Sequence, residues 1–273
     1  MVFRTVPRFV ERIWGGLPNP GGMPFGEIWW AWDDPTGSST LEASGDGGGP
    51  SCLNDLAPLT GRFPIVAKTL HPAEMLSLQV HPGLSGPGPR KAESWIFLKA
   101  GPGASVVLGL LPGTTSGRLA EAVEAGRPEP LLRRVPVHPG DILHVRPGTV
   151  HSLCGGVDVI EFQENCDITY RIWDWGRPGP GGAPREIHIA RALESTDFSP
   201  EAAEDQAGAS CPGFGYRIRA VSGSAALPPH SVLFVPGRDG DVPAGTCFVS
   251  DGGGGAAEAG DGGWMAEPEV EAG

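Results

Sequence analysis

Short apolar segments separated by glycine and proline fill the middle of the chain, and this spacing constrains the fold more than any other feature. Valine, isoleucine and aromatic side chains favour strands, whereas glycine and proline favour turns. Residues 114–126 form a helix candidate, with apolar side chains at helical spacing. The pattern predicts an all-β sandwich or jelly roll rather than alternating strands and helices. The strand candidates are 63–70, 75–80, 94–100, 104–110, 141–145, 157–162 and 168–175.

The frequency of turn residues raises the question of disorder, because the 273 residues include 43 glycines and 29 prolines. A hydrophobic content of 40% nevertheless supplies an ordinary globular core. We predict a catalytic domain over 1–195, a short and abbreviated β-module over 196–250, and a disordered glycine-rich tail over 251–273. A second disordered segment is expected around Gly47.

Charge and composition limit the classes of partner. A net charge of -12 disfavours binding to nucleic acid or to an anionic membrane, although one phosphate group needs only a few local cations. The sequence shows neither an apolar run of about 20 residues nor a compact signal-peptide core, so we expect a cytoplasmic protein. The five cysteines form no close pair, which favours reduced thiols over a disulfide framework or a thiolate zinc site.

Four side chains of metal-ligand type lie on segments that strand geometry can bring together. Gln79 and His81 alternate with apolar residues in LSLQVHP, so both project from the same face of a strand. Glu93 starts the next strand candidate, and His151 follows the turn in RPGTVHSL. A single strand histidine is more often structural than a ligand, but the set of four is typical of an open site for Zn²⁺ or another divalent ion.

The order of these segments is close to the two motifs of the cupin superfamily, with Gln-x-His in place of His-x-His. From residue 11 to about residue 193 the chain resembles the short, bacterial-type class I mannose-6-phosphate isomerases. The matching segments, in family order, are ERIWGG, GEIWW, FPIVAKTLHPAEMLSLQVHP, KAE, VPVHPGDILHVRPGTVHSL, ENCDITYRIWDWGR and PREIHIARAL. The resemblance implies a cupin β-sandwich that interconverts mannose 6-phosphate and fructose 6-phosphate through a cis-enediol, with one bound zinc ion.

The resemblance also implies roles for individual residues. It identifies the zinc ligands as the quartet that strand geometry indicates, namely Gln79, His81, Glu93 and His151. It further implies that Lys68 and Ser77 lie near the substrate phosphate, Trp14 near the pocket and Asp167 near the substrate, that Lys91 transfers the proton, and that Arg171 is the essential arginine. A metal ion and a guanidinium group would stabilise the negative charge that develops on the sugar oxygens.

Some features depart from the family pattern, and some questions stay open. Arg90 stands where longer relatives carry a histidine, and the C-terminal module is short. Two alternatives are another sugar-phosphate isomerase or epimerase on the same scaffold and a sugar-binding cupin without catalysis. The sequence leaves monomer and homodimer open, and other divalent metals could replace zinc.

Overall fold

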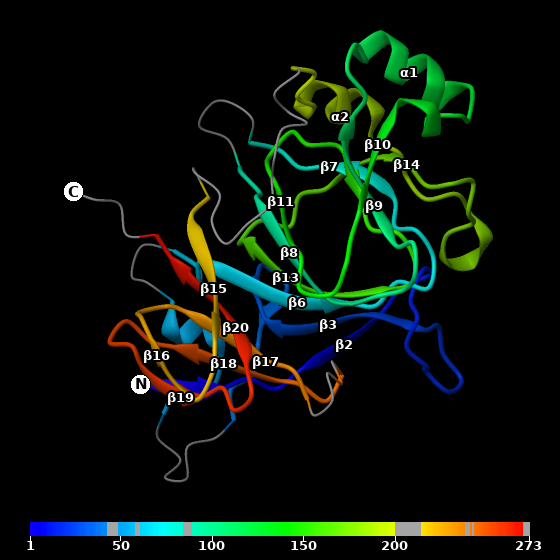
Figure 1. Cartoon of the computed structure of the whole chain (residues 1–273). Helices are drawn as coiled ribbons and strands as arrows, with labels where there is room; N and C mark the ends of the chain where they lie inside the picture. The colour runs from blue at the N-terminus through cyan, green and yellow to red at the C-terminus, as the bar shows by residue number, and fades with distance from the viewer. Residues whose placement is uncertain are drawn as a thin grey trace.

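The architecture is a β-sandwich with a further sheet packed on its back (Figure 1), which confirms the all-β prediction. The computed structural model describes residues 1–42, 49–57, 61–83, 89–199, 214–237, 241 and 243–269. The central sheet has six antiparallel strands in the order β11 (Ile142–Val145), β8 (Glu93–Ala100), β13 (Val157–Glu164), β6 (Ile65–Leu70), β3 (Phe25–Ala31) and β2 (Arg8–Glu11).

A second antiparallel sheet faces the first across the interior of the sandwich. Its order is β10 (Leu132–Pro136), β9 (Ser105–Leu110), β12 (His151–Ser152), β7 (Leu78–Val80) and β14 (Tyr170–Trp173). Two helices cover its outer side (Figure 1): α1 (Ser116–Glu124), which lies within the predicted range 114–126, and α2 (Ile189–Ser195). Leu119 of α1 and Ala192 of α2 join the apolar cluster that includes Leu78 and Val80 of β7.

The six-stranded sheet is buried on both faces because its side chains alternate between two cores. In β6, Ile65 and Ala67 point to the outer core, whereas Lys68 and Leu70 point into the sandwich. The same alternation in β13 sends Ile160 and Phe162 outward and their polar neighbours inward. The sandwich interior therefore contains both an apolar cluster and a row of charged and amide side chains.

The third sheet packs against the outer face of the six-stranded sheet and joins both ends of the chain (Figure 1). Its order is β1 (Val2–Arg4), β18 (Thr246–Ser250), β17 (Val232–Val235), β20 (Gly263–Pro268) and β15 (Tyr216–Val221). Tyr216 fixes the contact, because its hydroxyl donates to the carbonyl of Phe162 (2.7 Å) and lies 3.0 Å from Oγ of Ser94. This sheet reaches beyond the predicted module at 196–250, while the boundary at residue 195 stays a prediction.

The prediction of a disordered tail over 251–273 is wrong for most of that range. It contains β19 (Gly255–Glu258), which pairs with β16 (Ser224–Leu227), and the inner strand β20. Small residues are needed here because the strands pack closely: a Cβ at Gly263 would lie 2.6 Å from the carbonyl oxygen of Phe234. The apolar residues Met265 and Ala266 of this strand are fully buried. The predicted flexible segment at Gly47 lies outside the described residues, as do residues 270–273.

The remaining elements are short. They comprise the strand pair β4 (Asp33–Asp34) and β5 (Gly37–Ser38) and the 3-10 helices η1 (Leu53–Leu56), η2 (Glu129–Leu131) and η3 (Pro180–Gly182). Among the described residues, no helix is both long and apolar enough to cross a membrane.

Candidate active site

Three buried side chains with metal-binding atoms meet inside the sandwich. Nε2 of His81 lies 2.8 Å from Oε1 of Glu93, and Nε2 of His151 lies 3.7 Å from Oε2 of the same carboxylate. One ligand atom from each of the three residues lies within 4.8 Å of the others. His151 and Gln79 are direct partners across β12 and β7, and Nε2 of Gln79 is 3.2 Å from Nε2 of His151. A half-turn of that amide would present its oxygen to a metal.

A tight turn just before His151 is hydrogen-bonded to the segment that carries His81. The backbone amide of Gly148 donates to the carbonyl of His81 (3.0 Å). Gly148 has φ 85°, in the left-handed region that glycine adopts without strain. This hydrogen bond holds the turn against the segment of His81, and so helps to bring together two histidines that lie 70 residues apart in the sequence.

Both imidazoles have their Nδ1 atoms engaged and their Nε2 atoms directed at the centre of the site. Nδ1 of His81 lies 3.1 Å from the carbonyl of Ile168, and Nδ1 of His151 lies 2.8 Å from the carbonyl of Thr149. A carbonyl can only accept, so each Nδ1 carries the proton and each Nε2 offers a lone pair. Burial lowers the pKa of His81 to about 3 and lowers that of His151, so both rings are neutral near pH 7.

The buried donor atoms fit a divalent metal ion. Nε2 of His81 and Oε2 of Glu93 have no hydrogen-bond partner of good geometry among the described residues. Burial opposes ionisation of Glu93, but its interactions with His81 and Lys91 hold its pKa well below the usual range. Two neutral imidazoles and a carboxylate, with a nearby amide, form a donor set suited to Zn²⁺ with room for a further ligand.

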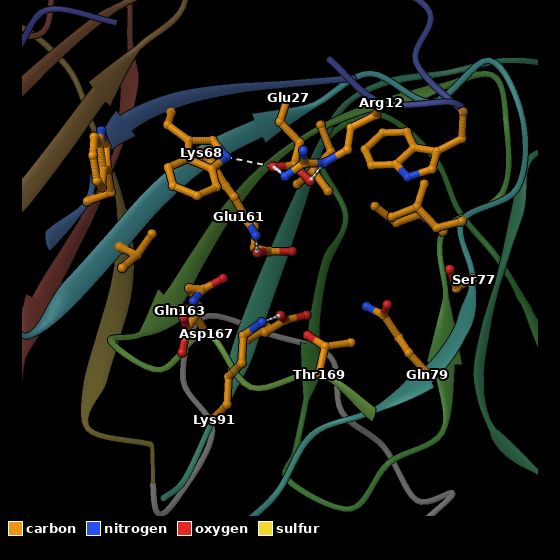
Figure 2. Close-up of a pocket in the computed structure, with 18 of the residues that line it drawn as sticks. Arg12, Glu27, Lys68, Ser77, Gln79, Lys91, Glu161, Gln163, Asp167 and Thr169 are labelled. Carbon is orange, nitrogen blue, oxygen red and sulfur yellow. Dashed lines mark hydrogen bonds and ion pairs between the residues drawn. The ribbon is translucent and has the colours of Figure 1, made fainter. Parts of the chain in front are cut away.

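Lysine and carboxylate side chains alternate beside this metal site. Nζ of Lys91 is 2.8 Å from Oε1 of Glu93, and Nζ of Lys68 is 3.0 Å from Oε1 of Glu161. Burial would lower the pKa of Lys68, but the surrounding carboxylates, Glu161 foremost, raise it. Burial and the Glu93 charge raise the pKa of Glu161. Lys68 therefore carries positive charge, and carboxylates hold both lysines inside the sandwich (Figure 2).

A cluster of arginines reaches another part of the same pocket through Arg171 and Arg185. Oγ of Ser77 donates to Asp174 (2.8 Å) and accepts from Arg171 (3.1 Å) and Arg185 (3.0 Å). Arg177 donates to Asp174 (2.7 Å), and Arg185 lies 3.4 Å from both of its oxygens. Burial, followed by the charge of Arg185, lowers the pKa of Arg171. Arg177 also lies 3.6 Å from Oε2 of the exposed Glu74, so three guanidinium groups face two carboxylates and keep an excess of positive charge that suits an anion.

The two lysines, Glu93, Ser77, Arg171 and Arg185 line one cavity of about 420 Å³, whereas Arg177 and Asp174 lie outside its lining. All the residues singled out in the sequence line it except His81 and His151, which are buried beside it. Asp167 is exposed at its edge, and Trp14 is buried in its wall. Arg90 is not among the lining residues and instead pairs with Glu164. The structure brings the candidate residues together, while their individual roles stay predictions.

The sequence interpretation missed several polar residues of this cavity. Glu161 and Gln163 lie on one face of β13. Glu27 accepts hydrogen bonds from Nε and Nη2 of Arg12 (3.0 and 2.9 Å). Arg185 was likewise not singled out. A signal was available in the segment IEFQ, where Glu161 and Gln163 alternate with the apolar Ile160 and Phe162, as expected for a strand that borders a polar site.

The curated proteins that this chain resembles are all named as mannose-6-phosphate isomerases, some of them provisionally. No profile of a known protein family matches the chain. YvyI of Bacillus subtilis, whose assignment as a mannose-6-phosphate isomerase is provisional, is 34% identical over 215 residues, covering 71% of this chain and 67% of YvyI. The chain spans about two thirds of the length of the curated relatives it matches.

Solved structures give the same fold over nearly the whole chain. The mannose 6-phosphate isomerase from Bacillus subtilis superposes with a TM-score of 0.78 at 24% identity, covering 97% of this chain and 99% of that one. A zinc-bound mannose 6-phosphate isomerase superposes with a TM-score of 0.69 at 15% identity, covering 98% and 100%. These structures show the fold, and the 34% identity to YvyI over two thirds of its length shows that the chain belongs to the mannose-6-phosphate isomerase family.

Proposed function

We propose that this protein interconverts mannose 6-phosphate and fructose 6-phosphate as a metal-dependent aldose-ketose isomerase. One observation carries the proposal: the buried cluster of His81, Glu93 and His151 borders a cavity that also holds a lysine at contact distance and two arginines of a positively charged cluster. A sugar phosphate has one anionic end and one polyol end, which matches these two parts of the cavity. Membership of the mannose-6-phosphate isomerase family supports the same assignment.

His81, Glu93 and His151, together with Gln79, would hold one zinc ion per chain. When bound, the metal supplies a fixed positive charge that stabilises negative charge on the sugar oxygens. The surrounding lysines and arginines orient the substrate through charge-assisted hydrogen bonds.

Isomerisation moves a proton between C1 and C2 of the open-chain sugar, and Lys91 is the group we assign to that transfer. Its Nζ lies 2.8 Å from Oε1 of Glu93, so it reaches the ligand cluster directly. The side chain is buried, which keeps bulk water from exchanging the proton during transfer. Arg171 stabilises negative charge on the substrate, because its guanidinium group lines the cavity and is oriented by Ser77 and the carbonyl of Glu186.

The arginine cluster is assigned to the phosphate group. Arg171 and Arg185 both donate to Oγ of Ser77, and a phosphate oxygen could replace that hydroxyl as their acceptor. The ammonium group of Lys68 adds positive charge from the facing sheet. Asp167 and Trp14 are kept as residues near the substrate, since both line the cavity.

We also propose a small-molecule substrate and a cytoplasmic location. A net charge of -12 supports a small-molecule substrate rather than nucleic acid. A substrate of this class is a metabolic intermediate, which supports the cytoplasm as the site of action. Monomer and homodimer both remain compatible with the sequence and the fold.

A coupled assay tests the function. Zinc-loaded protein is expected to form fructose 6-phosphate from mannose 6-phosphate, and removal of the metal by a chelator followed by zinc addition is expected to abolish and then restore the activity. Glu93→Gln is expected to lose both zinc and more than about a hundredfold in kcat/KM. The matched control is Glu124→Gln at the exposed end of α1. Absence of turnover by protein that holds one zinc ion per chain would refute the proposal, and equal use of unphosphorylated mannose would favour a different sugar isomerase.

A further inference from the structure

Gln163 presents an unpaired hydrogen-bond acceptor to the cavity. Its side chain is almost completely buried, with 4% of the residue exposed, and it lines the same cavity as the metal site. Among the residues that the structure describes, none donates a hydrogen bond to its Oε1. A buried acceptor without a donor is unfavourable, so such an atom in a binding cavity points to a donor that arrives with a ligand.

The orientation of the amide is fixed by its other end. Nε2 of Gln163 donates to the carbonyl of Cys166 (3.0 Å) and to the carbonyl of Glu164 (3.3 Å). Exchanging the oxygen and the nitrogen would place Oε1 against these two carbonyl oxygens and would lose both hydrogen bonds. These hydrogen bonds therefore fix the nitrogen end of the amide and leave Oε1 as the end without a partner. The same hydrogen bonds tie the side chain to the loop that carries Asp167, which lies near Gln163 in Figure 2.

The neighbours of Gln163 define which ligand group can reach it. Across the sheet it is paired with Glu93 on one side and with Val66 on the other, and Glu161 lies two residues away on the same face. These two carboxylates are paired with Lys91 (2.8 Å) and Lys68 (3.0 Å), so this part of the cavity has no excess of positive charge, unlike the arginine cluster. The phosphate group is therefore expected at the arginine cluster rather than here. A neutral hydroxyl group can donate to Oε1 and accept from a lysine at the same time.

We propose that Oε1 of Gln163 accepts a hydrogen bond from one hydroxyl group of the sugar and thereby selects the polyol end of the substrate. This inference rests on the proposed isomerase function. The amide binds the ring or chain of the sugar next to the metal ligand Glu93, while the arginine cluster binds the phosphate. A site that offers a buried acceptor rejects an analogue without the matching hydroxyl group, because the acceptor is then left unpaired.

A mutant cycle with deoxy sugars tests this assignment. The dissociation constants of mannose 6-phosphate and of its 2-, 3- and 4-deoxy analogues are measured by calorimetry with the zinc-loaded wild-type protein and with Gln163→Met. We expect one analogue to bind the wild type about tenfold more weakly on account of this hydrogen bond. That penalty should disappear in Gln163→Met, while the penalties of the other two analogues stay unchanged. Each ratio is taken within one protein, so a general loss of stability cancels.

Two outcomes would overturn the assignment. One is that all three deoxy penalties are the same in Gln163→Met as in the wild type, and the other is that all three change together, as a purely structural role would require. If the variant does not fold, the measurements on the wild type still test the assignment. It is overturned if all three deoxy analogues bind the wild type as tightly as mannose 6-phosphate does. Turnover of mannose 6-phosphate is recorded in parallel. Wild-type protein that binds the sugar phosphates without turnover would refute the proposed function, while the cycle would still decide the role of Gln163.

Discussion

Asp174 is the carboxylate at the centre of the arginine cluster, and its replacement by asparagine tests whether that cluster is an anion site. Its side chain is 6% exposed and that of Arg177, 2.7 Å away, is 14% exposed. Asp174 also accepts from Ser77 and faces Arg185. Asp174→Asn keeps the size of the side chain and one acceptor oxygen, so it removes mainly the negative charge.

The magnitude follows from burial. Removing one partner of a buried ion pair costs about 3 to 5 kcal/mol, and the oxygen that remains in asparagine places Asp174→Asn near the lower end, at about 3 kcal/mol. For a chain of this size the melting temperature falls by about 2 °C per kcal/mol, so a decrease of about 6 °C is expected. The same change removes a negative charge beside three guanidinium groups, which should tighten the binding of an anion.

Thermal unfolding with and without inorganic sulfate measures both effects. In the absence of sulfate the variant should melt about 6 °C below the wild type. Sulfate should stabilise the variant more than the wild type, because tenfold tighter binding adds about 1.4 kcal/mol at saturating sulfate. Asp261→Asn, in the exposed turn before β20, is the control for the change in net charge.

Two results would refute this reasoning. An unchanged melting temperature would mean that Asp174 does not stabilise the arginines. Equal stabilisation of the variant and the wild type by sulfate would mean that the cluster is not an anion site, whatever the cost of the substitution.

Two further predictions concern carboxylates that support the site. Burial opposes ionisation of Glu27, but neighbouring cations, including Arg12, lower its pKa below 4.5, so its stabilising effect is present above that pH and is lost as the pH falls below it. Glu27→Gln should cost about 2 kcal/mol at pH 7 and less at pH 3, measured by urea unfolding, and an equal cost at both values would contradict the assignment. Glu164 accepts a hydrogen bond from the backbone amide of Ala92, next to the ligand Glu93. Glu164→Gln should therefore weaken zinc binding by about tenfold in a chelator competition, whereas the control Glu124→Gln should not. Equal zinc affinity in the two variants would contradict this prediction.

The local pattern of the sequence was sufficient for the sheet and for half of the metal site. Alternation in LSLQVHP places Gln79 and His81 on the same face, because a strand has a two-residue period, and the structure has both residues beside the sandwich interior. The position of His151 opposite Gln79 follows from the pairing of β12 with β7. That pairing depends on the turn at Gly148, which a single sequence marks only as a turn.

Other features depended on residues far apart in the chain. The charge balance around Lys68 comes from Glu27 and Glu161, which lie 41 residues before it and 93 after it and meet only through the order of strands β3, β6 and β13. The strand at 263–268 was not predictable from its own composition, because its apolar contacts are supplied by the strands on either side.

The sequence by itself therefore determined the class of fold, the face from which each strand residue projects, and the residue types able to bind a metal and a phosphate. These properties depend on local backbone geometry and on side-chain chemistry. Only the tertiary structure decided which carboxylate neutralises which cation, and which buried atoms are left without partners. Those properties depend on distances of a few ångströms between strands that are not neighbours in sequence, and Oε1 of Gln163 is the atom for which this information mattered most.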